Sequence, residues 1–100
     1  MSADMARASI IFNAEEMGRL RQVDDQTISV DMHGLNRYEG KQFLKNLVVL
    51  AKQSRKITVI HGFHSGQVLM NMIREEFHSD RVTDIEPDDR NPGRTILKIA

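Results

Sequence analysis

The chain has 100 residues, of which 40% are hydrophobic and 28% charged, with 14 basic side chains, 14 acidic side chains and no cysteine. This length is typical of one domain that can bury a core of its own. The lack of cysteine excludes a disulfide framework and thiolate metal sites. The balanced charge shows that the chain as a whole is not basic, so any site for a polyanion must be a local patch.

The sequence also bears on the compartment. No apolar run approaches the roughly 20 residues that a membrane-spanning helix needs. The N-terminus lacks the basic, apolar and small-residue order of a secretory signal. We therefore expect a cytoplasmic protein without a membrane partner.

The first 25 residues are the least regular part of the chain. Alanine, methionine and glutamate favour helix there, but the apolar positions make a poor stripe. We expect an N-terminal arm or helix over residues 1–25, followed by a domain over residues 26–100. The arm is expected to end by Gly18, with a polar loop at residues 23–26. Its predicted docking residues are Ile10, Ile11 and Phe12.

Two strand-and-helix units follow the arm. Residues 27–31 alternate as a strand with one buried face does, and residues 37–53 carry a helical apolar stripe. The apolar run 57–60 predicts a central strand, and residues 66–78 predict a second amphipathic helix. The candidate N-caps of the two helices are Asn36 and Ser65.

The chain closes with a predicted hairpin. Residues 82–86 and 95–99 are expected strands, and the loop at 87–93 contains two prolines and a glycine. The order after the arm is therefore βαβαββ, which predicts an α/β fold with a parallel strand pair. Because each helix has a single apolar face, we expect an α+β two-layer sandwich: a mixed four-stranded sheet with both helices on one face. The other face is left to solvent-tolerant side chains, the arm or a partner.

Each of the first two strands ends in His-Gly. Residues 31–34 read Asp-Met-His-Gly, and residues 61–66 read His-Gly-Phe-His-Ser-Gly. If the strands are parallel neighbours, both corners lie at one edge of the sheet, where α/β proteins place their sites. Glycine permits sharp turns there, and helix N-termini attract anions. A cleft that contains His33, His61 and His64 would suit a phosphate ester.

The corner residues have several interpretations at this stage. Asp31 and His33 point the same way in extended backbone, so the carboxylate could orient the imidazole. Asp31 could equally tie the turn, and His33 and His61 could be hydrogen-bonded structural histidines. A third interpretation is a zinc or manganese site, although no His-x-x-x-His pair supports it. Its ligands would be Asp31, His33, His61 and His64.

On these motifs the sequence resembles the Smr (small MutS-related) domain family, over about residues 27–100. The family carries Asp-Leu-His-Gly after its first strand and His-Gly-x-Gly-x-Gly after its second. Asp31, His33 and Gly34 match the first motif, and the second is matched by His61, Gly62 and Gly66. The resemblance implies a βαβαββ sandwich similar to the C-terminal domain of a bacterial translation initiation factor. It also implies a nucleic-acid partner, which several members nick or cleave, and this chain is similar to the short stand-alone members.

The second motif departs from the family pattern at two positions. His64 replaces the middle glycine, and Phe63 replaces a common lysine or arginine. The loop thereby loses a flexible point and a cation, and it gains an imidazole and a ring that can stack on a base. Met32 in place of leucine is a mild change. These departures count against cleavage of a nucleic acid more than against binding of one.

We therefore predict a nucleic-acid-binding domain that acts as a weak endonuclease on DNA or RNA. The predicted catalytic residues are Asp31, His33 and His61. The predicted nucleic-acid contacts are Gly34, Lys41, Gly62, Phe63, His64, Ser65, Gly66, Arg90 and Arg94.

No metal ligand is assigned, and the metal dependence is left open. A metal-free histidine mechanism is easiest on RNA, whereas DNA cleavage favours water activated by a divalent ion such as magnesium or manganese. Two alternatives to an endonuclease remain: a binding module without catalysis, and a protein-interaction domain that uses the arm and the open sheet face.

Overall fold

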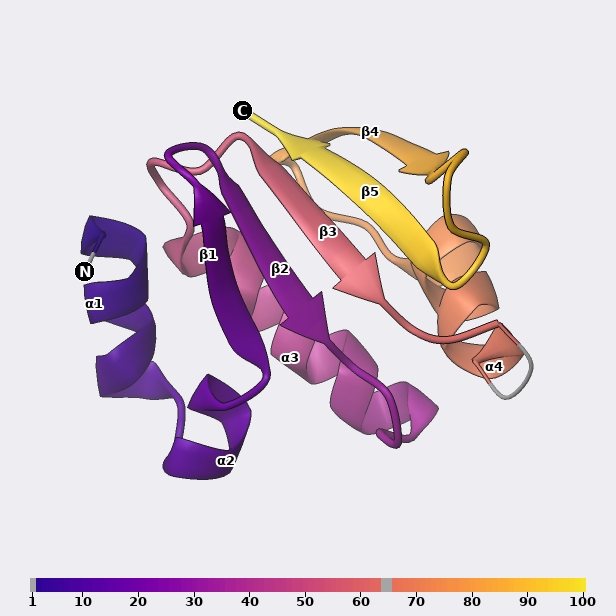
Figure 1. Cartoon of the computed structure of the whole chain (residues 1–100), viewed down its shortest axis with the longest axis horizontal. Coiled ribbons are helices and arrows are strands. Elements are labelled where there is room, and N and C mark those ends of the chain that lie inside the picture. Colours follow the sequence, from indigo (N-terminus) through magenta and orange to yellow (C-terminus); the bar gives the residue numbers. More distant parts are fainter. Residues whose placement is uncertain (1, 64–65) are drawn as a thin grey trace.

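The computed structural model describes residues 2–63 and 66–100, which are arranged around a five-stranded sheet (Figure 1). In the part of the chain that is described, no helix combines the length and the apolar character needed to cross a membrane. The elements in chain order are α1 (Ala3–Ile11), α2 (Ala14–Met17), β1 (Leu20–Asp24), β2 (Thr27–Asp31), α3 (Arg37–Leu50), β3 (Lys56–Ile60), α4 (Gln67–Asn71), the π-helical segment η1 (Met72–Glu76), β4 (Val82–Pro87) and β5 (Arg94–Ile99).

The sheet has the strand order β1-β2-β3-β5-β4. β2 and β3 are parallel, with Asp31 opposite Ile60, and the other neighbouring pairs are antiparallel. The predicted parallel pair and the predicted closing hairpin are therefore confirmed. Both parallel strands point toward the same edge of the sheet (Figure 1).

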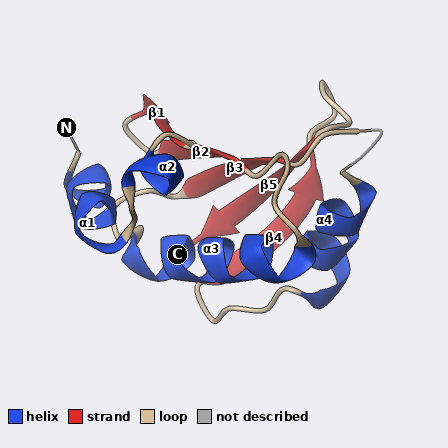
Figure 2. Ribbon diagram, turned by 90° about the horizontal axis from the view of Figure 1, so that it is seen from below, coloured by secondary structure: helices blue, strands red, loops and turns tan. Residues whose placement is uncertain are grey.

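The sheet is covered by helices on one face, as predicted. Figure 2 shows α3 and α4 on the same side of the sheet. The alternation along β2 and β3 explains this layering, because every second residue is fully buried and apolar while its neighbours are more exposed. The buried side chains of the two strands are Ile28, Val30, Ile57 and Val59.

α3 begins as the sequence predicts. Asn36 is its N-cap, and its side chain forms a capping box with Glu39. The apolar stripe of the helix is buried against the sheet, whereas the helix ends at Leu50 rather than at residue 53. The second helix is shorter than predicted, because α4 gives way to η1 after Asn71. Gly66 is the N-cap of α4, and the predicted cap Ser65 lies outside the described residues.

The strand count of four is wrong by one, because residues 20–24 form β1 at the edge of the sheet. Leu20 is its only buried residue, so the strand has no apolar alternation from which it could be predicted. A tight turn joins β1 to β2, in which the Gln26 amide donates to Oδ1 of Asp24 at 2.9 Å. The predicted loop at residues 23–26 is therefore partly strand and partly hairpin turn.

Of the three residues predicted to dock the arm, only Phe12 does so. Ile10 and Ile11 are 86% and 58% exposed, so the prediction that they dock the arm is wrong. Phe12 is buried, with its ring centroid 4.7 Å from that of Phe43 on α3. The division of the chain at residue 25 into an arm and a domain stays a prediction.

Candidate functional site

The two His-Gly corners are neighbours at the carboxyl ends of β2 and β3. The Met32 amide donates to the Ile60 carbonyl at 2.9 Å, which continues the parallel pairing past the end of β2. Gly34 and Gly62 both have a φ of 87°, a backbone conformation that favours glycine. A Cβ placed on Gly62 would lie 4.0 Å from Cδ2 of His33. The exposed His33 ring therefore lies against the second corner.

Asp31 ties the first corner through the main chain. Its Oδ1 accepts a hydrogen bond from the His33 amide at 2.9 Å. Within residues 2–63 and 66–100, no hydrogen bond or ion pair joins the Asp31 carboxylate to the His33 ring. This contact favours the interpretation that Asp31 ties the turn.

Arg19 holds the same corner from the segment before β1. Its Nη1 donates to the carbonyls of Asp31 and His33 at 3.1 and 2.8 Å, and its Nε donates to Glu15 at 2.8 Å. Arg19 was not predicted as a site residue. The only sequence signal was the Glu15–Arg19 spacing of four residues, which predicts a helical ion pair and not a contact with the corner.

The second corner depends on the close approach of two glycines. A Cβ on Gly66 would lie 1.9 Å from the His61 carbonyl oxygen and 2.5 Å from that of Gly62, so only glycine fits there. The carbonyl of Gly93 accepts the amides of both His61 and Gly62, at 2.9 and 3.0 Å. The Gly62 amide is therefore already used. Gly93 was not predicted, because a loop composition does not show which strand end the loop will contact.

His61 is fully buried and hydrogen-bonded through both ring nitrogens. Nδ1 lies 2.7 Å from the Gly62 carbonyl oxygen, which can only accept, so Nδ1 carries the proton. Nε2 lies 2.9 Å from Oγ1 of Thr95, and Nε of Arg74 donates to that same Oγ1 at 3.0 Å. The Thr95 hydroxyl therefore accepts from Arg74 and donates to His61.

This environment favours the neutral ring. Burial lowers the pKa of His61, the positive Arg74 lowers it further, and the hydrogen bond to the Gly62 carbonyl only partly opposes them. The ring has no exposure to bulk solvent, although His61 is among the residues that line a cavity beside His33. The geometry favours a positioning role for His61, and its predicted catalytic role stays a prediction.

A cavity of about 380 Å³ lies between the first corner and α4. His33 and Gly34 line one side, and Leu35, Val68 and Leu69 give it an apolar wall. The N-terminus of α3 borders it too, but there the amide of Glu39 already donates to Asn36 at 2.8 Å. The Glu39 carboxylate of the capping box also adds negative charge, so this helix end attracts anions less than the sequence suggested.

The other predicted contacts lie around and away from the corners. Phe63 is 53% exposed beside the second corner, and Lys41 is partly buried on the second turn of α3. Arg90 is exposed in the β4–β5 loop, and Arg94 begins β5 opposite Ile60. The predicted contacts His64 and Ser65 lie outside the described residues.

The described residues do not fit a metal centre. Nowhere in residues 2–63 and 66–100 do three or more histidine, aspartate or glutamate side chains come together to hold an ion. The Asp31 carboxylate is used by the turn, and both His61 nitrogens have partners.

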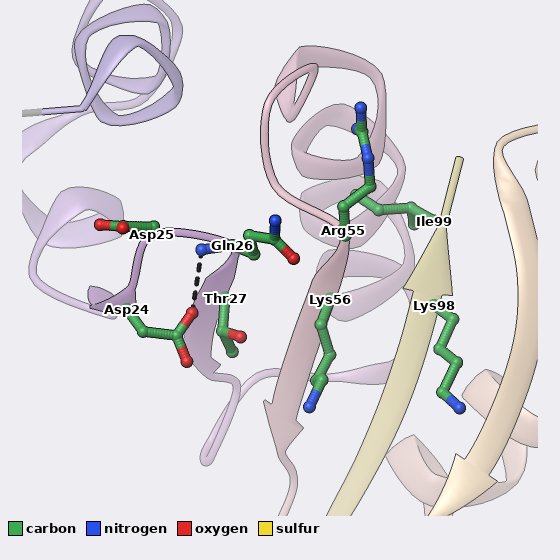
Figure 3. A pocket seen from close by; sticks show the side chains of 8 residues that line it. All are labelled: Asp24, Asp25, Gln26, Thr27, Arg55, Lys56, Lys98 and Ile99. Atoms are coloured by element: carbon green, nitrogen blue, oxygen red, sulfur yellow. Dashed lines mark hydrogen bonds between the residues drawn. The ribbon is translucent and has the colours of Figure 1, made fainter.

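A separate hollow of about 670 Å³ lies at the opposite end of β2 and β3 (Figure 3). Lys56 and Lys98 extend there from neighbouring strands, and Asp24 lies across from them. Hydrogen bonds from the Gln26 amide and the Thr27 hydroxyl are the main causes that lower the pKa of Asp24, with a smaller effect of Lys56. This hollow is remote from the corners, so it is not part of the candidate site.

Comparisons with known proteins bear on the fold. No protein-family profile matches the sequence, and no curated protein does either. Among solved structures, the crystal structure of the Smr domain of Thermus thermophilus MutS2 is similar, with a TM-score of 0.59 and 19% sequence identity. The likeness covers 72% of this chain and 96% of that chain. The chain therefore has the fold of an Smr domain.

Proposed function

We propose that the chain is a nucleic-acid-binding protein of the Smr family that cleaves RNA phosphodiester bonds slowly at the His33 corner. One observation carries the proposal: the exposed ring of His33 lies against the second His-Gly corner, 4.0 Å from a Cβ built on Gly62. An exposed imidazole beside two tight glycine turns leaves room for a phosphate and its ribose close to the ring. The Smr fold and the two motifs support the same assignment.

The proposed chemistry needs only proton transfers. His33 takes the proton of a ribose 2′-hydroxyl, and the 2′-oxygen attacks the adjacent phosphorus atom. The bond to the 5′-oxygen breaks, and that oxygen takes a proton from the protonated His33 or from water, which gives a 2′,3′-cyclic phosphate and a 5′-hydroxyl end. Because the described side chains do not gather as metal ligands, no step is routed through a metal ion.

The residues around His33 act by positioning it. Asp31 fixes the turn through the His33 amide, and Arg19 fixes the same turn through two carbonyls. His61 holds the Gly62 carbonyl at 2.7 Å and thereby shapes the second corner. The remaining predicted contacts extend the proposed binding surface: Gly34, Lys41, Phe63, Gly66, Arg90 and Arg94. The predicted contacts His64 and Ser65 lie outside the described residues.

Single-turnover cleavage of end-labelled single-stranded RNA tests the reaction. We expect RNA products that end in a 2′,3′-cyclic phosphate, formed equally well with and without EDTA. The same sequence as DNA, or as RNA with 2′-O-methyl riboses, should stay intact because it lacks the nucleophile. Cleavage of the DNA or of the methylated RNA would overturn this mechanism.

A binding module without catalysis is the second candidate function. It is favoured by the burial of His61, which leaves His33 as the only exposed imidazole among the described residues of the two corners. In that case the protein should bind RNA with a steep salt dependence, as phosphate contacts require, and yield no product. A protein that binds no nucleic acid at all would favour the protein-interaction alternative.

A further inference from the structure

The face of the sheet opposite α3 and α4 carries a hollow next to the first corner. Its volume is about 420 Å³, and it lies over the carboxyl-terminal halves of β2 and β3. Three arginines, Arg19, Arg21 and Arg94, line it together with a single carboxylate, that of Asp31. The chain as a whole has no net charge. This hollow is therefore the kind of local basic patch that a polyanion site in such a chain requires.

The floor of the hollow is polar and regular. Ser29 on β2 is paired with Thr58 on β3, and Arg21 on β1 is opposite Ser29. These residues alternate with the buried side chains that face the helices, so they lie on the open face. Arg94 begins β5 on the far side of β3, opposite Ile60. The strand order thus places the hydroxyls of Ser29 and Thr58 between the guanidinium groups of Arg21 and Arg94.

Arg94 has a donor that the described chain leaves unused. Its Nε is buried and has no hydrogen-bond partner among the described residues. Each of the other part-buried arginines donates from its guanidinium group to an oxygen of the chain; these are Arg7, Arg19, Arg74 and Arg81. A buried donor without an acceptor is rare in proteins, because it has lost water and gained nothing in return. An oxygen supplied by a ligand would satisfy this donor once the Arg94 side chain turns Nε toward the hollow.

We propose that this hollow binds a backbone phosphate of the RNA strand whose neighbouring segment reaches His33. Guanidinium groups match phosphate oxygens with paired donors, and the Ser29 and Thr58 hydroxyls add two more donors. Asp31 lines the hollow and His33 follows two residues later, so a strand that leaves the hollow past the end of β2 comes to His33. A polymer with regularly spaced phosphates can occupy the hollow and reach the His33 ring at the same time. The inference rests on the proposed function in one respect, because it takes RNA as the ligand.

Two double variants test the site. Arg21→Gln with Arg94→Gln removes two charges at the hollow. Lys56→Gln with Lys98→Gln removes two charges from β3 and β5 at the opposite end of the sheet (Figure 3). We expect the arginine pair to weaken the binding of fluorescently labelled single-stranded RNA at least tenfold at low salt. The salt slope should fall by about 0.7 for each phosphate that the variant no longer neutralises. The lysine pair should weaken binding severalfold less, and equal losses of affinity from the two pairs would overturn the proposal.

The Arg94 Nε–H signal in the NMR spectrum of the wild-type protein gives a readout that does not depend on how a variant folds. The chemical shift of this signal should change when RNA is added in substoichiometric amounts. Movement with inorganic phosphate but not with RNA would overturn the nucleic-acid assignment, and no movement with either would overturn the site. Arg94→Lys, which keeps the charge but not the paired donors, should fall between wild type and Arg94→Gln in RNA affinity.

The two proposals fail in distinguishable ways. If the wild-type protein cleaves RNA but the arginine and lysine pairs behave alike, the phosphate site is wrong and the proposed function stands. If the protein binds no RNA, the proposed function and the RNA ligand are both wrong. The inorganic phosphate titration then decides whether the hollow binds a phosphoryl group.

Discussion

Asp31 acts on the first corner through the main chain, because its carboxylate accepts the His33 amide rather than the ring. Asp31→Asn keeps an Oδ1 acceptor, whereas Asp31→Ala leaves that amide unpaired. Because this hydrogen bond is exposed and water can replace the carboxylate, we expect the alanine variant to lose about 0.5–1.5 kcal/mol of unfolding free energy. The asparagine variant should lose less than half of that and keep most of the RNA cleavage rate. Urea unfolding and single-turnover cleavage measure both, and an asparagine variant as damaged as the alanine one would contradict this role.

His61 should make the fold sensitive to mild acid. Burial lowers its pKa in the folded chain below the ordinary value of 6.5, so the unfolded chain binds the extra proton first. The unfolding free energy should therefore be fully present above about pH 6.5 and decline as the pH falls below that value. NMR titration of the imidazole signals checks the cause directly. A His61 ring that titrates at or above its ordinary pKa would contradict the hydrogen-bonded, neutral assignment.

The positions of the two corner motifs could be predicted from the sequence, but the residues that hydrogen-bond to the corners could not. Strand periodicity and His-Gly spacing were enough to place His33 and His61 at one sheet edge. Arg19, Arg74 and Thr95 reach the corners from segments far along the chain, through hydrogen bonds that depend on the finished fold. No local pattern marks such residues, and only the finished fold shows that His61 is buried while His33 is exposed.

At the scale of elements, α1 is attached by a buried carboxylate. Asp4 is 1% exposed, and its oxygens accept the Gln53 amide, the Ser54 amide and the Ser54 hydroxyl at 2.7–3.1 Å, as well as a donor of Arg7. Burial by itself raises the pKa of Asp4, but the hydrogen bonds from Ser54, Gln53 and Arg7 outweigh it and lower the pKa below 3.8. The N-terminal helix is thus fixed to the loop between α3 and β3.

Asp4→Ala should destabilise the protein by about 1–3 kcal/mol for each buried donor that it leaves unpaired. Urea unfolding at neutral pH measures this, and Asp89→Ala, which removes an exposed carboxylate, is the matched control. Because the folded pKa is lowered, the stabilisation is present above about pH 3.8 and is lost as the pH falls below it. Equal stabilities for the two variants at neutral pH would contradict the attachment.

Elements were predictable where their local signals agreed with their burial. α3 has a capping box and an apolar stripe, and it begins where the sequence indicated. β1 is a polar edge strand whose pairing with β2 supplies most of its stability, so its own residues carry little strand signal. The change from α4 to η1 is not marked in the sequence either, because residues 67–76 contain no proline or glycine.

For the whole molecule, the one-sided layering decides where a nucleic acid can lie. α3 and α4 cover one face of the sheet (Figure 2). The basic hollow with Arg21 and Arg94 lies on the other face, beside the edge where His33 is exposed. A strand of RNA on the open face would reach the candidate catalytic residue without displacing any helix. The fold is that of an Smr domain, and the corner histidine is what makes cleavage a specific hypothesis.

The rate of RNA cleavage by His33→Ala tests this account most directly. His78 is also exposed, but it lies beyond the C-terminal end of η1, so His78→Ala is the matched control. In single-turnover assays with saturating protein, His33→Ala should cleave about 10² to 10⁴ times more slowly than wild type, the usual range for general acid–base catalysis. Its RNA affinity and unfolding midpoint should stay unchanged, and His78→Ala should cleave at the wild-type rate. A folded His33→Ala protein that cleaves RNA as fast as the wild type would contradict the account.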